Sequence, residues 1–227
     1  MIARQLQDVR ARIATACRAA GRAPDAVALL AVSKTFGADA VRAAHAAGQH
    51  AFGENYIQEA VDKIDALRDL PLQWHCIGPI QSNKTRLVAE RYDWAHSVDR
   101  LKIAERLSAQ RPDDLAPLQV CLQVNIDGGP TKSGVAPAEA LALARTVAAL
   151  PRLKLRGLMT IPEPAPDFEA ALAVHRRARA LFDELNADGL ALDTLSMGMS
   201  ADLEAAIAAG STLVRIGTAI FGSRVPK

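Results

Sequence analysis

The sequence predicts an α/β protein whose strands form a closed (β/α)8 barrel, with one additional helix at the N-terminus. Short apolar runs of strand length alternate with amphipathic segments along the chain, and no change of composition marks a linker. Such alternation requires a parallel sheet, because each return crossover runs over a face of the sheet. Eight units within 227 residues favour a closed barrel over a doubly wound open sheet, and no GxGxxG motif follows the first strand. We therefore expect residues 1–227 to form one domain.

The additional helix is expected over residues 2–20. Apolar residues recur there at steps of three or four, which places them on one face of the helix, and Gly21 ends it. This apolar face consists of Ile2, Leu6, Val9, Ile13 and Cys17.

Eight apolar runs bounded by polar or turn-forming residues are expected as strands. The run that ends at Val32 is apolar throughout, which is typical of a strand buried on both faces. The sixth run is interrupted by Gly157. In chain order, the expected strands span residues 27–32, 50–52, 72–77, 94–97, 118–125, 153–159, 194–197 and 213–216.

The segments between these strands are expected as helices. Gly48 stands where a left-handed cap would end the first of them, and Pro137 opens the fifth at a favoured first-turn position. In chain order, the expected helices span residues 39–47, 56–67, 84–91, 100–110, 137–150, 168–186 and 201–209.

Composition excludes several classes of protein. The formal net charge of +2 gives no support to a nucleic-acid partner or an anionic membrane surface. Cys17, Cys76 and Cys121 are scattered and form no CxxC pair, which fits reduced thiols in a cytoplasmic protein rather than disulfides or a metal site. No apolar run approaches the ~18 residues of a membrane span, and no signal peptide follows Met1. We expect a cytoplasmic protein without a metal, a nucleic-acid partner or a membrane partner.

Polar residues follow the predicted strands at the end where all the βα loops of a barrel converge, which is where barrels bind their ligands. Lys34 follows the first strand, and partial desolvation there would keep its amine reactive as a nucleophile. Considered alone, Lys34 is better explained as a solvated strand end. The other polar residues at this end include Asn55, His75, His96, Asn125, Thr160, Ser200 and Arg215.

The last two units resemble a phosphate site. Ser200 precedes a predicted helix, where it can cap free backbone donors or bind an anion. Gly217 permits close approach of the backbone to a phosphate, and the amides of Gly217 and Thr218 can point at its oxygens. An ordinary N-cap and an ordinary turn explain either feature alone, but the pair on adjacent strands facing Lys34 favours an anion site.

A lysine amine and a phosphate site on opposite sides of one opening indicate a phosphorylated carbonyl compound held as a Schiff base. Pyridoxal 5′-phosphate (PLP) is the first candidate, and the sugar phosphate of an aldolase is the second. Arg215 lies two residues before Gly217, so its side chain points the same way. A guanidinium is a permanent donor, and opposite a pyridine nitrogen it would keep that nitrogen unprotonated. A salt bridge at the rim explains Arg215 equally well.

Short blocks that follow one another from the first strand to the C-terminus resemble the YggS/PROSC family of pyridoxal-phosphate homeostasis proteins. Together they are far more specific than any single motif. In order they are VSKT at 32–35, FGENY at 52–56, HCIG at 75–78, QSNK at 81–84, HSVD at 96–99, QVN at 123–125, KSG at 132–134, RGLM at 156–159, SMGMS at 196–200 and RIGTAIFG at 215–222.

This resemblance implies a fold-type III barrel like the N-terminal domain of bacterial alanine racemase, with PLP bound as a Schiff base to Lys34. It implies roles for the other residues of the site as well. Ser200, Gly217 and Thr218 are expected at the phosphate, Arg215 near the pyridine nitrogen, Asn55 and Met197 near the ring, and His75 along the same opening.

The resemblance further implies a protein that buffers PLP and delivers it to apo-enzymes, without established catalytic turnover. Alanine racemase needs a second base, a tyrosine supplied by a separate domain and a partner subunit, whereas this chain ends soon after its last predicted strand. Its two tyrosines, Tyr56 and Tyr92, fall in a predicted helix and before the fourth strand. We therefore expect a monomeric carrier with no catalytic residue, and keep a minimal PLP-dependent racemase and a phosphosugar aldolase as alternatives. Lys84 and Lys132 are expected to be surface charges or groups that pass the cofactor on.

Overall fold

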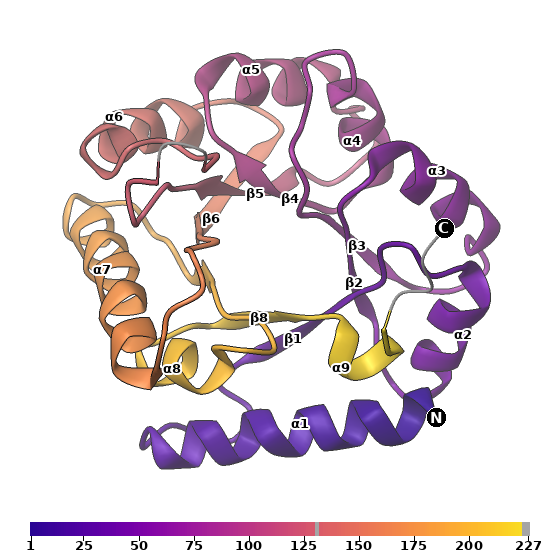
Figure 1. Ribbon diagram of the computed structural model, residues 1–227. Helices are drawn as coiled ribbons and strands as arrows, with labels where there is room; N and C mark the ends of the chain where they lie inside the picture. Colours follow the sequence, from indigo (N-terminus) through magenta and orange to yellow (C-terminus); the bar gives the residue numbers. More distant parts are fainter. Residues whose placement is uncertain (130–131, 224–227) are drawn as a thin grey trace.

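The computed structural model describes residues 1–129 and 132–223 and consists of a closed barrel of eight parallel strands inside a ring of helices (Figure 1). Neighbouring strands follow the order of the sequence, and pairing of the first strand with the last closes the barrel. The predicted fold class is thereby confirmed. The strands are β1 (Ala28–Val32), β2 (Ala51–Glu54), β3 (Gln73–Cys76), β4 (Trp94–Val98), β5 (Leu118–Gln123), β6 (Leu153–Met159), β7 (Thr194–Ser196) and β8 (Leu213–Ile216).

Helices follow each strand and cover the outside of the barrel. Their bounds lie close to the predicted ranges, except that the short helix α9 was not expected. The helices are α1 (Ile2–Ala19), α2 (Ala38–Ala46), α3 (Ile57–Ala66), α4 (Thr85–Arg91), α5 (Leu101–Gln110), α6 (Pro137–Ala148), α7 (Phe168–Ala187), α8 (Leu203–Ala208) and α9 (Thr218–Phe221).

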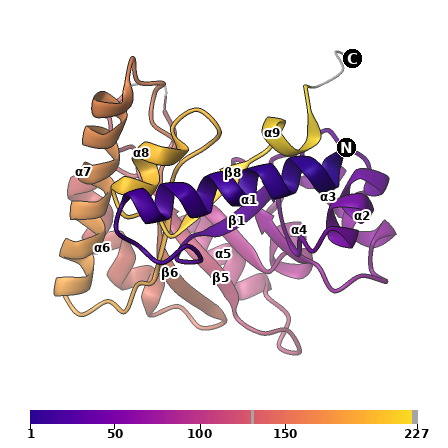
Figure 2. The same cartoon turned by 90° about the horizontal axis from the view of Figure 1, so that it is seen from below.

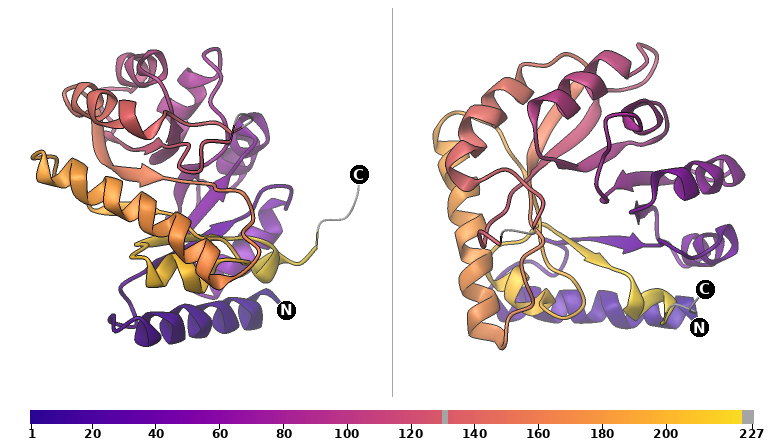
Figure 3. Two further views of the ribbon diagram at one scale, coloured as in Figure 1. Left: turned by 60° about the vertical axis from the view of Figure 1, so that its left-hand side comes forward. Right: turned by 45° about the horizontal axis from the view of Figure 1, so that its top comes forward.

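Helix α1 lies on the outside of the barrel beside β8 and β1 (Figure 1). It contacts α8 near one end and α9 near the other (Figure 2), and it also contacts α2. Figure 3 shows the same arrangement from two further directions, with α7 standing beside α8. The apolar face predicted for this helix packs inward: Leu6, Val9, Ile13 and Cys17 are buried.

Strand β5 is shorter than predicted because Asn125 turns the chain. The side-chain amide of Asn125 donates to the carbonyl oxygen of Gly129 at 2.9 Å, and its Oδ1 accepts from the amide of Gly128 at 3.1 Å. An asparagine that bonds its own neighbouring backbone favours a turn over a strand. The β-strand therefore ends at Gln123.

Most apolar side chains form a core between the strands and the helices, and two smaller clusters fill the inside of the barrel. One inner cluster joins Leu30, Val32, Ile77 and Leu213, and the other joins Trp94, Cys121 and Met159. Burial of these surfaces is the main source of stability in such a fold. Within the described residues, no helix is at once long and apolar enough to cross a membrane.

Gly157 is required by the pairing of β6 with β7. A Cβ atom at this position would lie 1.6 Å from the carbonyl oxygen of Thr194 in the neighbouring strand. Such a distance is far below van der Waals contact, so no other residue fits without separating the strands.

Candidate functional site

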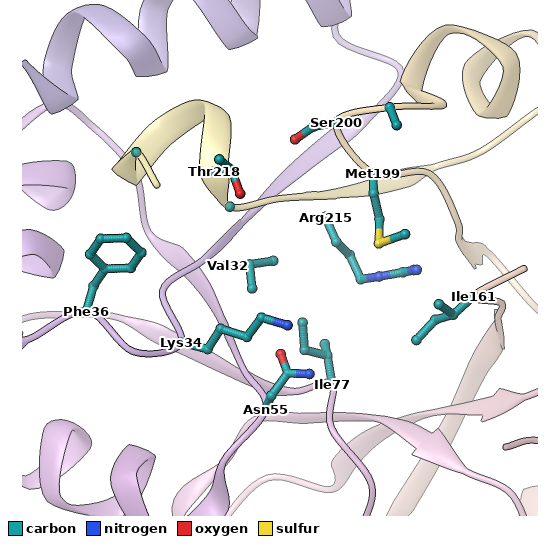
Figure 4. Close-up of a pocket in the computed structure, with 13 residues that line it drawn as sticks. Val32, Lys34, Phe36, Asn55, Ile77, Ile161, Met199, Ser200, Arg215 and Thr218 are labelled. Atoms are coloured by element: carbon teal, nitrogen blue, oxygen red, sulfur yellow. The ribbon is translucent and has the colours of Figure 1, made fainter. Parts of the chain in front are cut away.

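A cavity of about 480 Å³ opens at the carboxyl ends of the strands, within the size range of small-molecule sites (Figure 4). In a (β/α)8 barrel this end is where ligands bind, because the βα loops converge there. The cavity is lined by Val32, Lys34, Phe36, Asn55, Ile77, Ile161, Met199, Ser200, Ala201, Arg215, Gly217, Thr218 and Gly222.

Six of the eight residues proposed from the sequence line this one cavity. Lys34 and Asn55 lie on one side of it, while Ser200 and Thr218 lie on the opposite side (Figure 4). Arg215 reaches into it from β8, as expected from its position two residues before Gly217. Lys34 and Arg215 are the titratable side chains among the described residues of the lining.

The other two residues proposed from the sequence do not line the cavity. His75 is buried deeper inside the barrel, because Ile77, two residues further along, lies between it and the opening. Met197 is fully buried in the outer core, since it follows the inward-pointing Ser196 and faces the opposite way. Met199 lines the cavity in its place.

Phe36, Ile161 and Met199 also line the cavity, and nothing in the sequence pattern predicts them there. Phe36 stacks on Phe221 of α9, with ring centroids 5.2 Å apart, and so forms a wall of the cavity beside Gly222. All three residues lie in loops after strands, where periodicity carries no signal about direction.

The backbone on each side of Lys34 is fixed by hydrogen bonds. The amide of Ser33 donates to Gly53 of β2 at 3.0 Å. Thr35 has a φ angle of 70°, in the left-handed region, and its amide donates to Glu59 Oε1 at 2.8 Å. A β-branched residue at such a φ is strained, so the surrounding contacts hold the turn that presents Lys34.

A buried ion pair between Lys63 and Glu54 supports the same turn. Lys63 Nζ lies 2.6 Å from Glu54 Oε1, and the two side chains are 5% and 0% exposed. Lys63 also donates to the carbonyl oxygen of Ser33 at 2.9 Å, and the Ser33 hydroxyl donates to Glu54 at 2.6 Å. Burial raises the pKa of Glu54 against the opposing effect of Lys63 and Ser33.

The opposite side of the cavity is suited to an anion. Helix α9 begins at Thr218 with Gly217 as its N-cap residue, and no side chain of the described residues caps it. A (β/α)8 barrel commonly binds phosphate between the loops after its last two strands, at the start of a short extra helix. A Cβ atom at Gly217 would lie 3.1 Å from the carbonyl oxygen of Val32, so glycine lets the end of β1 approach this point.

The loop that carries Ser200 is held by Asp202. Its Oδ1 accepts from the amide of Met199 at 2.7 Å, and its Oδ2 lies 2.9 Å from Nε2 of the buried His175. Burial alone would raise the pKa of Asp202, but the hydrogen bonds from His175 and Met199 outweigh it and lower the pKa below its usual value.

Arg215 is buried, and uncharged oxygens accept its hydrogen bonds. Nη1 donates to the carbonyl oxygen and to the hydroxyl of Ser196 at 2.8 and 2.7 Å, and Nη2 donates to the carbonyl oxygen of Thr160 at 2.8 Å. Burial lowers the pKa of Arg215 to about 10, which leaves the guanidinium charged at neutral pH.

Asn55 Oδ1 is buried and has no hydrogen-bond partner within the described structure, although Asn55 lines the cavity. An unsatisfied buried oxygen is costly, and a ligand hydroxyl would satisfy it. The lining thus fits a molecule with an aldehyde, a ring hydroxyl, a ring nitrogen and a phosphate. These groups match the Lys34 amine, Asn55, Arg215 and the start of α9 in turn.

Comparisons with known proteins agree with this geometry. The family model described as "Alanine racemase, N-terminal domain" matches residues 5–225. The pyridoxal phosphate homeostasis protein of Pseudomonas aeruginosa is 62% identical over 98% of this chain and 96% of its own length. The protein of the same name from Escherichia coli K12 is 54% identical over 98% of this chain and 97% of its own length.

A solved structure shares the fold throughout. PipY of Synechococcus elongatus, with PLP bound, has a TM-score of 0.86 and 39% identity, covering 98% of this chain and 100% of that chain. Because relatives with more than half of their residues identical match nearly the whole length, the chain belongs to the family of pyridoxal phosphate homeostasis proteins.

Proposed function

We propose that this protein binds PLP in the cavity at the mouth of its barrel and serves to buffer PLP and deliver it to apo-enzymes. The observation that carries the proposal is the position of the Lys34 amine opposite Ser200 and Thr218 across one cavity (Figure 4). The names of the relatives and the PLP-bound PipY structure support it.

Each polar residue of the lining has a role in this proposal. Ser200, Gly217 and Thr218 would bind the phosphate, and Asn55 would bind the ring hydroxyl. Arg215 would donate to the ring nitrogen and keep it unprotonated. The cofactor would supply an aldehyde, which condenses with the Lys34 amine to a Schiff base and one water.

The lining favours a carrier over a racemase. A racemase needs an acid or base on each face of the substrate, and Lys34 is the one suitable group among the described lining residues. Tyr92 is buried away from the cavity, with a pKa raised by burial, and the exposed Tyr56 precedes α3 outside the lining. We therefore propose that the bound cofactor turns over no amino acid.

The test is an absorption spectrum of the purified protein, followed by borohydride reduction and peptide mass spectrometry. We expect a Schiff-base band and a reduced pyridoxyl group on Lys34. The Lys34→Ala variant should lose both, whereas Lys102→Ala, a change at an exposed residue of α5, should keep them. A pyridoxyl group attached elsewhere, or an unchanged spectrum for Lys34→Ala, would overturn the proposal.

Two alternatives give different results in the same assays. A minimal racemase would exchange the α-hydrogen of an amino acid in deuterated water at a useful rate. A phosphosugar aldolase would yield a sugar trapped on Lys34 after reduction, without any pyridoxyl fluorescence.

A further inference from the structure

A chain of hydrogen bonds runs through the inside of the barrel from Arg215 to Gln73. Arg215 Nη1 lies 2.7 Å from Ser196 Oγ, and Ser196 Oγ lies 3.0 Å from His96 Nδ1. His96 Nε2 lies 2.8 Å from His75 Nδ1, and His75 Nε2 lies 3.0 Å from Gln73 Oε1. The chain therefore connects the cavity to Gln73, an exposed residue at the first position of β3.

The burial of these groups fixes their charge. His75 and His96 are 1% and 0% exposed, and burial lowers the pKa of His75 to about 3 and holds that of His96 well below its usual value. Both imidazoles are therefore neutral at physiological pH, with one ring nitrogen donating and the other accepting.

The guanidinium sets the direction of every bond in the chain. Because Arg215 only donates, Ser196 Oγ accepts from it, and the serine hydrogen is available to His96 Nδ1. His96 then donates from Nε2 to His75, and His75 donates from Nε2 to Gln73. In this arrangement each dipole turns its negative end toward Arg215, which stabilises the buried cation.

The reverse direction would place a donor nitrogen of His96 against Ser196 and turn the positive ends of the dipoles toward the guanidinium. Electrostatics therefore favours the first direction, because within the described residues only uncharged oxygens accept hydrogen bonds from the buried Arg215.

Packing keeps the two imidazoles in place. Trp94 stacks on His75 with ring centroids 5.1 Å apart and an interplanar angle of 9°. Arg156 lies over Trp94, 4.7 Å from the ring centroid, and is itself paired with Asp193 at 2.8 Å. Rotation of His75 would break this stack as well as two hydrogen bonds.

We propose that Ser196, His96 and His75 are positioning residues, which act as one chain of uniform polarity to hold Arg215 charged and directed toward the ring of the bound cofactor. This proposal rests on the proposed function for the identity of the ligand. The direction of the chain, by contrast, is a property of the cofactor-free protein. The same chain explains why His75 lies away from the cavity while Arg215 lies within it.

The first experiment is long-range proton–nitrogen NMR of the histidine side chains in the cofactor-free protein at pH 7. We expect both His75 and His96 as neutral tautomers protonated on Nε2, with the exposed His50 as an internal reference. Protonation of either ring on Nδ1, or a charged ring, would overturn the proposal. Because this measurement needs no ligand, its outcome is independent of whether PLP binds.

The second experiment compares PLP binding by His96→Leu, which breaks the chain, with His96→Gln, whose amide can accept and donate in place of the ring. We expect the dissociation constant to rise about tenfold in His96→Leu and to stay within about threefold in His96→Gln. Cys121→Ala, which alters the inner apolar cluster outside the chain, is the matched control and should bind PLP normally.

Equal affinities of His96→Leu and the wild-type protein would overturn the positioning role, and so would a loss in His96→Gln as large as that in His96→Leu. If the wild-type protein itself binds no PLP, the proposed function fails while the NMR result stands.

Discussion

Lys63 donates a hydrogen bond to the carbonyl oxygen of Ser33, the residue that immediately precedes Lys34 in the chain. The same ammonium is paired with Glu54 at 2.6 Å, so a buried ion pair joins helix α3 to the ends of β1 and β2. The amine proposed to hold the cofactor is thus presented from a rigid part of the barrel, as a preorganised site requires.

The first prediction concerns this ion pair. Lys63→Met leaves the carboxylate of Glu54 buried without a counter-charge, which should reduce the free energy of unfolding by about 3–5 kcal/mol. The double variant Lys63→Met/Glu54→Gln should recover most of the loss, because neither charge then remains. Urea unfolding followed by circular dichroism measures both effects.

A matched control is Arg42→Ala, which breaks the exposed pair with Asp69 and should leave the unfolding midpoint unchanged. A double variant less stable than Lys63→Met would contradict the explanation, since the cost would then come from lost packing.

The second prediction is a dependence of stability on pH that arises from His75. Its pKa is about 3 in the folded protein and 6.5 in the absence of burial. Below pH 6.5 the unfolded chain binds a proton on this ring that the native protein does not bind. Stability therefore falls with decreasing pH, by about 1.4 kcal/mol per pH unit for this histidine until its folded pKa is reached.

Urea unfolding at several values between pH 6.5 and pH 5 measures this slope. The His75→Gln variant lacks the titrating ring, so its free energy of unfolding should fall less steeply with decreasing pH. The difference between the two slopes is the contribution of His75. Carboxyl groups titrate in both proteins, and their contributions cancel in the difference. Parallel curves for the two proteins would show that His75 is accessible to protons in the native state.

Much of the fold and part of the site could be predicted from the sequence. The alternation of strands and helices requires a parallel sheet, and the residues after each strand then share one end of it, which brings Lys34, Ser200 and Arg215 into one cavity. Met197 lies outside the lining because successive residues of a strand face opposite sides, and Met197 follows the inward-facing Ser196 at the end of β7.

The inner chain of hydrogen bonds was not visible in the sequence at all. His75, His96 and Ser196 come from three different strands, and only the register of the closed barrel brings them into contact. His75 was expected at the cavity because polar residues near strand ends share that edge, yet its depth along the strand places it below Ile77.

The third prediction concerns the phosphate side of the cavity. In Gly217→Ala the added Cβ would lie 3.1 Å from the carbonyl oxygen of Val32, so β1 or the start of α9 must shift by a few tenths of an ångström. We expect affinity for PLP to fall about tenfold, with competition by inorganic phosphate weakened in parallel. Fluorescence titration measures both constants.

Gly37→Ala is the control for this change, because a Cβ there meets no atom within 4 Å and the residue has an ordinary negative φ. This variant should bind PLP as the wild type does. Equal affinities of the two alanine variants would place the phosphate away from Gly217.

The last prediction concerns Asp202. This residue does not line the cavity, but its carboxylate holds the turn that carries Ser200. Its two oxygens accept from the Met199 amide and from His175. The side chain of Asp202→Ala has no acceptor, so both the Met199 amide and the His175 ring lose their partner. We expect a loss of about 1–3 kcal/mol in unfolding free energy and weaker binding of PLP and of inorganic phosphate.

Glu204→Gln is the control for this change. Glu204 lies in α8, two residues after Asp202, and forms a half-exposed pair with Arg12, so its substitution should leave phosphate binding intact. If Asp202→Ala lost stability but bound phosphate as tightly as the wild type, Ser200 would not depend on this turn, and the anion would be held by Gly217 and Thr218 alone.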